Sequence, residues 1–250
     1  MSLRCCGLVP TYDNPVTIRR VVERIRQDLA DVVVIDDGSH QAGREACAAL
    51  ARDGLAHVVR TERNLGKGAA VRHGLEVARS RGFSHAFQID ADGQHDLGRI
   101  APFLAAAHSD PDAVVAAYPE YDDSAPALRS AARQITRFWV AVETGAWDRI
   151  VDGMIGFRVY PIDTTLAAKA KSNRMAFDVE VLVRMARSGV PILNLPVAVR
   201  YLRPEEGGLS HFQPLRDNLR MTWMHSRLCT MYATRWCLER LGILGKARRT

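Results

Sequence analysis

The feature that most constrains the fold is the alternation of two hydrophobic periods along the first 117 residues. Short apolar runs predict buried strands, and the segments between them carry apolar residues at helical spacing. The predicted strands are residues 5–9, 32–36, 56–60, 85–89 and 112–117, and the predicted helices are residues 15–29, 40–52, 68–78 and 100–107. Strand–helix alternation builds βαβ units with right-handed crossovers. We therefore expect an α/β fold, with a mainly parallel sheet flanked by helices.

The second half of the chain is less regular. Residues 125–144 predict a helix, residues 152–161 a loop and a strand, and residues 177–187 a further helix. Proline interrupts residues 190–202, which is typical of an edge strand because proline cannot donate a ladder hydrogen bond. Residues 203–212 form a charged, Gly-rich loop of the kind that closes over a site.

Polar clusters follow four of the predicted strands. They are residues 10–14, 36–39, 64–68 and 90–96. In open α/β sheets, ligands bind beyond the carboxyl ends of the strands. The clusters therefore predict one binding site at one edge of the sheet.

The segment DADGQHD places Asp90, Asp92, His95 and Asp96 within seven residues. Carboxylates this close repel one another, so burying them requires a positive partner. Mg²⁺ takes oxygen ligands and typically uses one or two carboxylates together with substrate phosphates. Asp90 and Asp92 are therefore candidate ligands of a metal that carries a diphosphate. The alternative is a solvated, Asp-rich turn, which the D-x-D spacing alone does not exclude.

The other clusters suit a nucleotide. Asp36 and Asp37 can accept hydrogen bonds from a base or from ribose hydroxyls, although Asp37 or Ser39 can instead cap the helix that follows. Lys67 lies in a Gly-flanked loop and suits a phosphate or a base, with a solvated lysine as the alternative. His95 is either a ligand group beside the carboxylates or a structural histidine.

Two familiar motifs are absent. Lys67 does not belong to a P-loop, because Thr61 and Gly68 stand where that motif needs Gly and Ser or Thr. No G-x-G-x-x-G follows the first strand, so the dinucleotide-binding fingerprint is missing. A phosphotransfer hydrolase with Asp90 as nucleophile is a less favoured alternative, because Gln94 stands where Thr or Val is expected.

The net charge of +6 is concentrated at the C-terminal end. Residues 214–250 contain eight basic and two acidic residues, so they carry the whole excess. A uniformly basic nucleic-acid binder would not show this distribution, and we expect no nucleic-acid partner. The segment has Trp, Leu and Met at mostly helical spacing, which is typical of a basic amphipathic helix on an anionic membrane surface. The alternative is a helix packed on its own domain with a solvated basic face.

The remaining composition bears on the compartment. Five scattered cysteines without C-x-x-C spacing indicate neither a zinc site nor a disulfide framework, and they fit a reducing cytoplasm. The sequence shows no signal-peptide pattern and no apolar window of about 18 residues. We expect a cytoplasmic protein that is peripheral on the inner face of the cell membrane.

Four segments carry a family resemblance. VPTYDN, VVVIDDGS, RNLGKGAAVRHG and IDADGQHD resemble, in order and spacing, the nucleotide-sugar-binding half of family-2 glycosyltransferases with the GT-A fold. The DADGQH form is most similar to the dolichyl- or polyprenyl-phosphate mannose synthase branch. The resemblance covers about residues 5–200. It implies a GT-A domain over residues 1–213, with a nucleotide-sugar half to about residue 120 and an acceptor half from about residue 121. Residues 214–250 then form a separate helical tail.

The resemblance also implies the roles of individual residues. A UDP- or GDP-linked sugar would be held by Pro10, Thr11, Tyr12, Asp13, Asp36, Asp37, Asn64, Lys67, Asp90 and Ala91. Asp90 and Asp92 would bind Mg²⁺ or Mn²⁺ with the diphosphate. The acceptor and the diphosphate would meet Gln94, His95, Arg158, Arg203, Ser210 and His211, the last of which replaces the lysine usual in the branch.

The reaction implied is transfer with inversion at the anomeric carbon. A hydroxyl acceptor needs a general base, for which Asp178, Glu180 and Asp152 are the candidates. A phosphate acceptor needs cations instead, and the sequence offers Arg129, Arg133, Arg158 and Arg203. Residues 213–217 lack the Trp of the Q-x-x-R-W motif, so long-polymer synthesis is not expected.

These observations predict a metal-dependent, inverting glycosyltransferase. Its acceptor would be lipid-linked and polyprenyl-phosphate-like, or otherwise close to a membrane. The non-enzymatic alternative is a glycosyltransferase-like scaffold that docks on membranes without catalysis.

Overall fold

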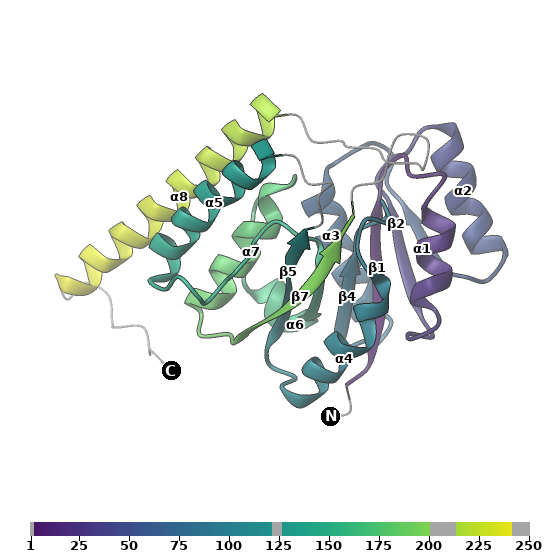
Figure 1. Ribbon diagram of the computed structural model, residues 1–250, viewed down its shortest axis with the longest axis horizontal. Helices are drawn as coiled ribbons and strands as arrows, with labels where there is room; N and C mark the ends of the chain where they lie inside the picture. Colours follow the sequence, from purple (N-terminus) through teal and green to yellow (C-terminus); the bar gives the residue numbers. More distant parts are fainter. Residues whose placement is uncertain (1–2, 122–126, 201–213, 242–250) are drawn as a thin grey trace.

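A computed structural model describes residues 3–121, 127–200 and 214–241 (Figure 1). Its centre is a seven-stranded sheet in the order β3-β2-β1-β4-β6-β5-β7. The strands are β1 (Cys5–Thr11), β2 (Val32–Asp36), β3 (His57–Arg60), β4 (His85–Ile89), β5 (Val114–Tyr121), β6 (Phe157–Pro161) and β7 (Ile192–Val199). Strand β6 is antiparallel to both β4 and β5, and the other pairs are parallel. The expectation of a mainly parallel sheet is therefore confirmed.

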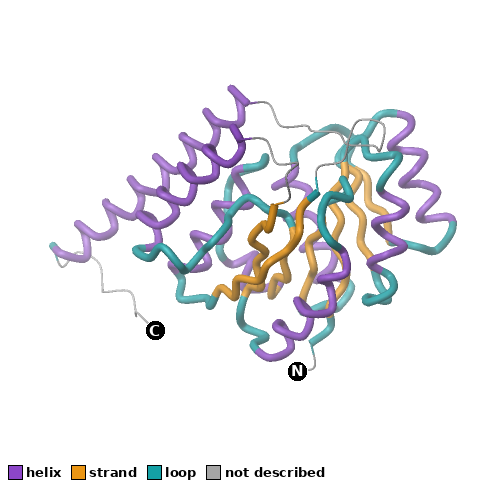
Figure 2. The backbone as a smooth tube through the Cα atoms, viewed as in Figure 1, coloured by secondary structure: helices purple, strands orange, loops and turns teal. Residues whose placement is uncertain are grey.

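Helices cover both faces of this sheet (Figure 2). They are α1 (Ile18–Ile25), α2 (Gln41–Arg52), α3 (Lys67–Ser80), α4 (Ile100–Ser109), α5 (Ala127–Thr144), α6 (Ile162–Ala167), α7 (Ala176–Arg187) and α8 (Pro214–Arg240), with a short 3₁₀ turn at Leu97–Arg99. Helices α1, α2 and α4 contribute to the apolar core on one face. Helices α3, α6 and α7 contribute to the core on the other. The central strands are buried on both faces of the sheet, which explains why their sequences are continuous apolar runs.

Most element boundaries agree with the sequence to within two residues, and the exceptions have local reasons. Helix α1 begins only at Ile18, because the residues before it form turns that link it to β1. Strand β5 extends to Tyr121, because it pairs along its whole length with β7. Strand β7 lies at the sheet edge, as its prolines predicted. The six-residue helix α6 was not predicted.

Helices α5 and α8 lie side by side at one end of the molecule, next to α7 (Figure 1). Helix α8 packs inward through Met221, Met224 and Leu228, which are buried in the same core as α7. A buried contact joins its His225 to Glu143 of α5, with 2.9 Å between Nδ1 and Oε1. Helix α8 therefore packs on its own domain. Across the described segments, no helix is both long and apolar enough to cross a membrane.

Candidate active site

The polar loops gather at one edge of the sheet because of the strand order. Strand β1 lies between β2 and β4 and runs parallel to both, so the loops that follow these three strands leave the sheet together. Hydrogen bonds join them: Thr17 Oγ1 donates to the Ala91 carbonyl at 2.6 Å, and the Asp13 amide donates to Ser39 Oγ at 2.9 Å. The expected clustering is present in the structure.

Lys67 lies at the centre of this edge. Its Nζ is 2.8 Å from Asp90 Oδ2 and 2.8 Å from Asp178 Oδ2, so one cation bridges a carboxylate just after β4 and a carboxylate of α7. Its side chain is only 15% exposed. Burial alone would lower the pKa of Lys67, but the charges of Asp178 and Asp90 outweigh it and raise the pKa. Lys67 is therefore a fixed positive charge and not the solvated lysine of the alternative.

The Asp90 carboxylate is confined on its other side by Gly156. A Cβ at Gly156 would lie 2.2 Å from Asp90 Oδ1, and the Asp90 amide donates to the Gly156 carbonyl at 3.1 Å. Asp90 Oδ1 is buried and has no hydrogen-bond partner among the described residues. Burying a carboxylate oxygen without a partner is unfavourable, which indicates a position completed by a bound group.

Asp92 is the second carboxylate of the pair. Burial raises its pKa, His95 partly offsets this, and the nearby charge of Asp90 adds to it. Asp92 Oδ1 accepts the Gln94 amide at 3.0 Å, which closes the turn. The ring of His95 rests against Phe157, with 5.6 Å between the ring centroids.

The two carboxylates fit a divalent cation that is also bound by a ligand. In the described ranges no group of three or more His, Cys, Asp or Glu side chains could hold a metal ion. A cation at Asp90 and Asp92 would therefore need further oxygens from a substrate, which is the usual arrangement for Mg²⁺. The unpartnered Asp90 Oδ1 and the raised pKa of Asp92 both indicate a deficit of positive charge at this point.

On the nucleotide side, the paired aspartates are already bound within the protein. Asp36 pairs with Arg60 and accepts the Ser39 amide at 2.9 Å. Asp37 accepts the amides of Leu65 and Gly66 at 2.8 and 2.7 Å. Both carboxylates therefore shape the loops that would surround a base, and any direct contact with a nucleotide would be additional.

The structure excludes the capping alternative for this region and adds a basic partner that was not predicted. Neither Asp37 nor Ser39 caps α2, because His40 occupies the N-cap position and makes no side-chain cap bond. Arg60 was overlooked as the basic partner of Asp36. The signal was available, since Arg60 ends the predicted strand that lies beside the one ending in Asp36.

The remaining nucleotide-side residues lie around the same loops. Asp13 has a left-handed backbone (φ 53°) and binds the amide and ring of His40, which fixes the loop after β1 to the loop after β2. Thr11 Oγ1 donates to Asn14 Oδ1 at 3.2 Å, and the ring of Tyr12 lies near that of His40. Pro10 continues β1 as a buried residue.

The three candidate bases have different surroundings. Asp178 faces Lys67 and is 1% exposed, so it is a buried counter-ion. Glu180 points the other way, because residues two apart on a helix differ in direction by about 200°. Its carboxylate accepts hydrogen bonds from Lys171, Ser172 and Arg184 and pairs with Arg227 of α8. This geometry corrects the choice of Glu180 as a base, because it faces away from Lys67.

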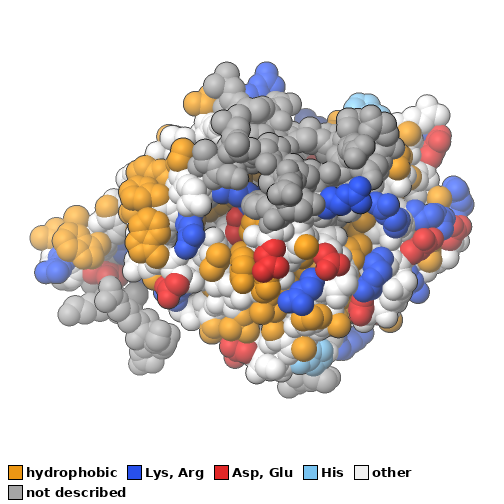
Figure 3. Space-filling model, viewed as in Figure 1, with side chains coloured by type: hydrophobic (Ala, Val, Ile, Leu, Met, Phe, Trp, Pro, Cys, Tyr) orange, Lys and Arg blue, Asp and Glu red, His pale blue; other side chains and the backbone are white. Residues whose placement is uncertain are grey.

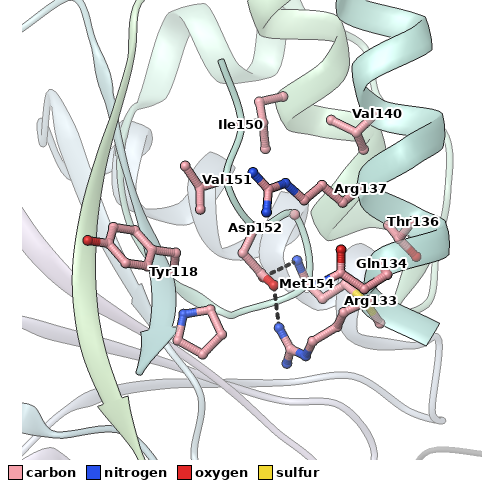
Figure 4. A pocket seen from close by; sticks show the side chains of 12 residues that line it. Tyr118, Arg133, Gln134, Thr136, Arg137, Val140, Ile150, Val151, Asp152 and Met154 are labelled. Carbon is pink, nitrogen blue, oxygen red and sulfur yellow. Dashed lines mark hydrogen bonds and ion pairs between the residues drawn. The ribbon is translucent and has the colours of Figure 1, made fainter. Parts of the chain in front are cut away.

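Asp152 is also engaged. Its Oδ1 accepts the amides of Met154 and Ile155 at 2.7 and 3.0 Å, and its Oδ2 pairs with Arg133 of α5. It lines a cavity of about 240 Å³ between α5, the end of β5 and the 150–154 loop. Figure 4 shows Arg133 and Arg137 reaching from α5 toward Asp152 in this cavity. Tyr118, Val140 and Ile150 supply part of its lining.

Arg158 was expected to meet the acceptor or the diphosphate, and the structure corrects this. Its side chain is fully buried beneath the site, where it donates to the carbonyls of Asp178 and Gly153 at 2.5 and 2.7 Å and to the Tyr160 hydroxyl at 3.0 Å. Arg158 therefore supports α7 and the 152–154 loop from within.

Residues 7–163 match the protein family described as "Glycosyl transferase family 2". The chain belongs to glycosyl transferase family 2. It is an enzyme of the glycosyltransferase class, with the GT-A fold and a further C-terminal helix.

Three relatives of this glycosyltransferase are informative. Glycosyltransferase AglJ of Haloferax volcanii is 28% identical over 218 residues, covering 85% of this chain and 67% of that protein. The undecaprenyl-phosphate mannosyltransferase of Micrococcus luteus is 26% identical over 209 residues, covering 78% of this chain and 83% of that protein. The polyprenol monophosphomannose synthase of Mycolicibacterium smegmatis is 25% identical over 206 residues, with coverages of 78% and 76%.

A solved structure confirms the fold of the transferase. Glucosyl-3-phosphoglycerate synthase from Mycobacterium tuberculosis, in complex with Mn²⁺, uridine diphosphate and phosphoglyceric acid, superposes with a TM-score of 0.66. The sequence identity is 15%, and the match covers 92% of this chain and 78% of that one. At this identity the likeness shows the shared fold alone.

The last group of predicted site residues lies outside the described part of the transferase. These residues are Arg203, Ser210 and His211. The described chain before them is attached to the 90–96 loop: the Arg200 amide donates to the Gln94 carbonyl at 3.0 Å, and the Asp96 amide donates to the Ala198 carbonyl at 3.0 Å. Their roles remain predictions.

Proposed function

We propose that this glycosyltransferase moves a sugar, with inversion, from a nucleoside-diphosphate sugar to the phosphate of a polyprenyl-phosphate-like lipid. The observation that carries the proposal is the bridge from Lys67 to Asp90 and Asp178. Asp92 lies two residues after Asp90 in the same loop. The bridge places a buried cation beside two carboxylates at the edge of the sheet where α/β proteins bind ligands.

On the donor side, Asp90 and Asp92 would hold Mg²⁺ or Mn²⁺. When bound, such a metal neutralises charge on the leaving diphosphate. Lys67 adds a second positive charge that the protein itself positions, and a preorganised charge of this kind is a large part of transition-state stabilisation. Crystallised relatives of the same fold contain Mn²⁺ together with uridine diphosphate or UDP-glucose, which supports a metal in this role.

On the acceptor side, the described carboxylates favour a phosphate over a hydroxyl. Asp178 is buried against Lys67, Glu180 faces away, and Asp152 is bound by two amides and Arg133, so each candidate base is already committed. A phosphate acceptor needs no base, because its oxygen is already anionic, but it needs cations. Arg133 and Arg137 line the cavity beside Asp152 and suit a phosphate. The names of the mannosyltransferase relatives support a lipid phosphate.

A membrane-facing surface would bring such a lipid to the site. We define the α5–α8 face as the exposed apolar residues Ile135, Phe138, Trp139 and Val142 of α5 and Leu219, Trp223, Met231 and Trp236 of α8. Figure 3 shows hydrophobic side chains gathered at the end of the molecule where these helices lie. The α5 residues follow an i, i+3, i+4, i+7 spacing, which places them on one stripe.

The charge of α8 suits an anionic leaflet. Arg216, Arg220 and Arg240 are exposed along the same helix as Trp223 and Trp236. Basic residues beside interfacial tryptophans are attracted to anionic lipids, which are concentrated on the cytoplasmic leaflet. We therefore infer a peripheral position on the inner face of the cell membrane.

The test is a transfer assay with defined substrates. Purified protein is incubated with polyprenyl phosphate, Mn²⁺ and UDP- or GDP-linked hexoses, and glycolipid is detected by mass spectrometry. Asp92→Asn and Lys67→Met should lower the rate by about 100-fold or more, because the first removes a proposed metal ligand and the second removes a positive charge beside the diphosphate. Asp96→Asn, in the same loop but exposed, should retain activity. Undiminished transfer by Lys67→Met would contradict the proposal, and phosphatase activity dependent on Asp90 without transfer would favour the hydrolase.

A further inference from the structure

Glu180 is a buried carboxylate that the proposed reaction does not use. Its side chain is 0% exposed. Oε1 accepts the Lys171 amide at 3.1 Å and Arg184 Nε at 2.7 Å. Oε2 accepts the Ser172 amide at 2.8 Å and its hydroxyl at 2.6 Å. Burial raises the pKa of Glu180, but the hydrogen bonds from Ser172, Lys171 and Arg184 outweigh it and lower the pKa. The carboxylate therefore fixes the 171–172 turn to α7.

Helix α8 supplies a further cation to this carboxylate. Arg227 Nη2 lies 2.7 Å from Glu180 Oε2, and the Arg227 side chain is 27% exposed. The contact comes from the inward side of α8, near the buried residues Met224 and Leu228. The outer side of α8 belongs to the α5–α8 face, and its Arg227 thus pairs with a carboxylate buried in the domain.

The turn held by Glu180 supports the loop that carries Lys67. The Ala69 amide donates to the Asn173 carbonyl at 3.1 Å, and Arg72 Nη1 donates to the Ser172 carbonyl at 2.6 Å. Arg174 Nη1 donates to Asn64 Oδ1 at 2.6 Å. The packing is close, because a Cβ at Gly68 would lie 2.6 Å from the Ser172 carbonyl oxygen. A shift of the turn would therefore displace the first residues of α3, including Lys67.

We propose that Arg227 is a positioning residue, which ties α8 to the donor loop at residues 64–69 through Glu180 and the 171–174 turn. Without Arg227, Glu180 loses a cation that compensates its buried charge, and its hold on the Ser172 amide weakens. The looser turn then leaves the donor loop less constrained. The effect on a donor substrate rests on the proposed function, whereas the effect on the loop itself does not.

The first test measures the loop without any substrate. Arg227→Gln is compared with Arg235→Gln, which makes the same charge change on an exposed part of the same helix. Hydrogen exchange followed by mass spectrometry should show faster exchange in Arg227→Gln at residues 171–173 and 65–69, with Arg227→Lys close to the unaltered protein. Thermal denaturation of each variant shows whether it is folded. Unchanged exchange at both segments in folded Arg227→Gln would overturn the proposal.

The second test measures the KM for the donor substrate. In the transfer assay, Arg227→Gln should raise the donor KM by roughly 3- to 30-fold, the range found for residues that couple sites at a distance. The Arg235→Gln variant should keep the KM of the unaltered protein. A fall in kcat with unchanged KM would indicate a smaller folded fraction and overturn the positioning role. If the unaltered protein transfers no sugar, the proposed function fails, while the exchange result still decides the coupling.

Discussion

Asp90 meets a different neighbour on each of its two oxygens. Oδ2 pairs with Lys67, whereas Oδ1 lies against Gly156 and has no hydrogen-bond partner among the described residues. The carboxylate is thus held by sterics as much as by charge. Because Gly156 precedes β6 and Asp90 follows β4, the antiparallel pairing of these strands sets the fit.

Gly156→Ala is expected to disturb the metal position directly. Its Cβ would overlap all three atoms of the Asp90 carboxylate, so the carboxylate must leave its present position. We expect a loss of about 1–3 kcal/mol in stability and about a 10- to 100-fold weaker Mn²⁺-dependent nucleotide affinity. Isothermal titration with Mn²⁺ and nucleotide measures the second effect. Gly98→Ala, at an exposed glycine beside Asp96, serves as control, and equal affinities in the two variants would contradict this account.

Asp92→Asn should separate stability from function. Burial and the charge of Asp90 disfavour ionised Asp92, as the raised pKa shows, and an amide removes that cost while still accepting the Gln94 amide. Without metal at neutral pH, we expect Tm to rise by about 2–4 °C, the equivalent of ~1 kcal/mol for a chain of this size. Added Mn²⁺ with nucleotide should raise the Tm of the unaltered protein only. A lower Tm in the metal-free variant would show that Asp92 is stabilising as it stands.

Helix α7 carries two acidic residues with opposite tasks. Asp178 faces Lys67, whereas Glu180 faces the turn and α8. The sequence predicted this helix and both candidates, and the helical period alone already separates their directions. Which side of α7 faces the ligand could not be predicted, because the orientation of α7 depends on how it packs against α3 and α8.

Glu180 should give the fold an acid-sensitive component. Its pKa is lower in the folded protein, so its stabilisation is present above the unfolded value of about 4.3 and is lost as pH falls through the folded value. We expect Tm to fall more steeply between pH 5 and pH 3, as approximate limits, in the unaltered protein than in Glu180→Gln. Glu76→Gln, at an exposed glutamate of α3, should keep the steeper fall. If Tm falls equally steeply with pH in all three proteins, Glu180 does not contribute to the acid sensitivity of the fold.

Prediction from sequence succeeded where the signal was local. The strands and the loops after them follow from hydrophobic period and turn residues, and parallel pairing then brings Asp37 and Asp90 to one edge. Arg60 and Arg227 were not recognised as parts of the site or its support, because their partners lie 24 or more residues away. Such contacts exist only once the layers are packed. Arg158 was misplaced for the same reason, since nothing local marks an arginine as fully buried.

At the scale of the molecule, charge and apolar surface are segregated. Residues 214–250 carry the whole net charge, and the described part of this segment is the helix that contributes Trp223 and Trp236 to the α5–α8 face. The inner side of the same helix is buried in the core with α7. The division of the chain at residue 213 remains a prediction.

Binding to anionic vesicles should depend on this face. Phe138→Ser combined with Trp223→Ser should weaken co-sedimentation with vesicles of phosphatidylglycerol and phosphatidylcholine by about tenfold or more, because two large apolar groups no longer enter the interface. Binding of the unaltered protein should also fall as salt rises. Val16→Ser, at an exposed apolar residue near α1, is the control. Equal binding by both variants would exclude the α5–α8 face as the docking surface.

The reversed direction of β6 has a consequence for how the fold can diversify. Because β5 and β6 are antiparallel neighbours, β5 ends and β6 begins at the same edge of the sheet. The segment between them is therefore an excursion from that one edge. Helix α5 and the 150–154 loop belong to this excursion, whereas the strands that seat the donor do not. Under the proposed function, sequence changes within residues 127–156 would alter the acceptor side and leave the donor-side strands in place.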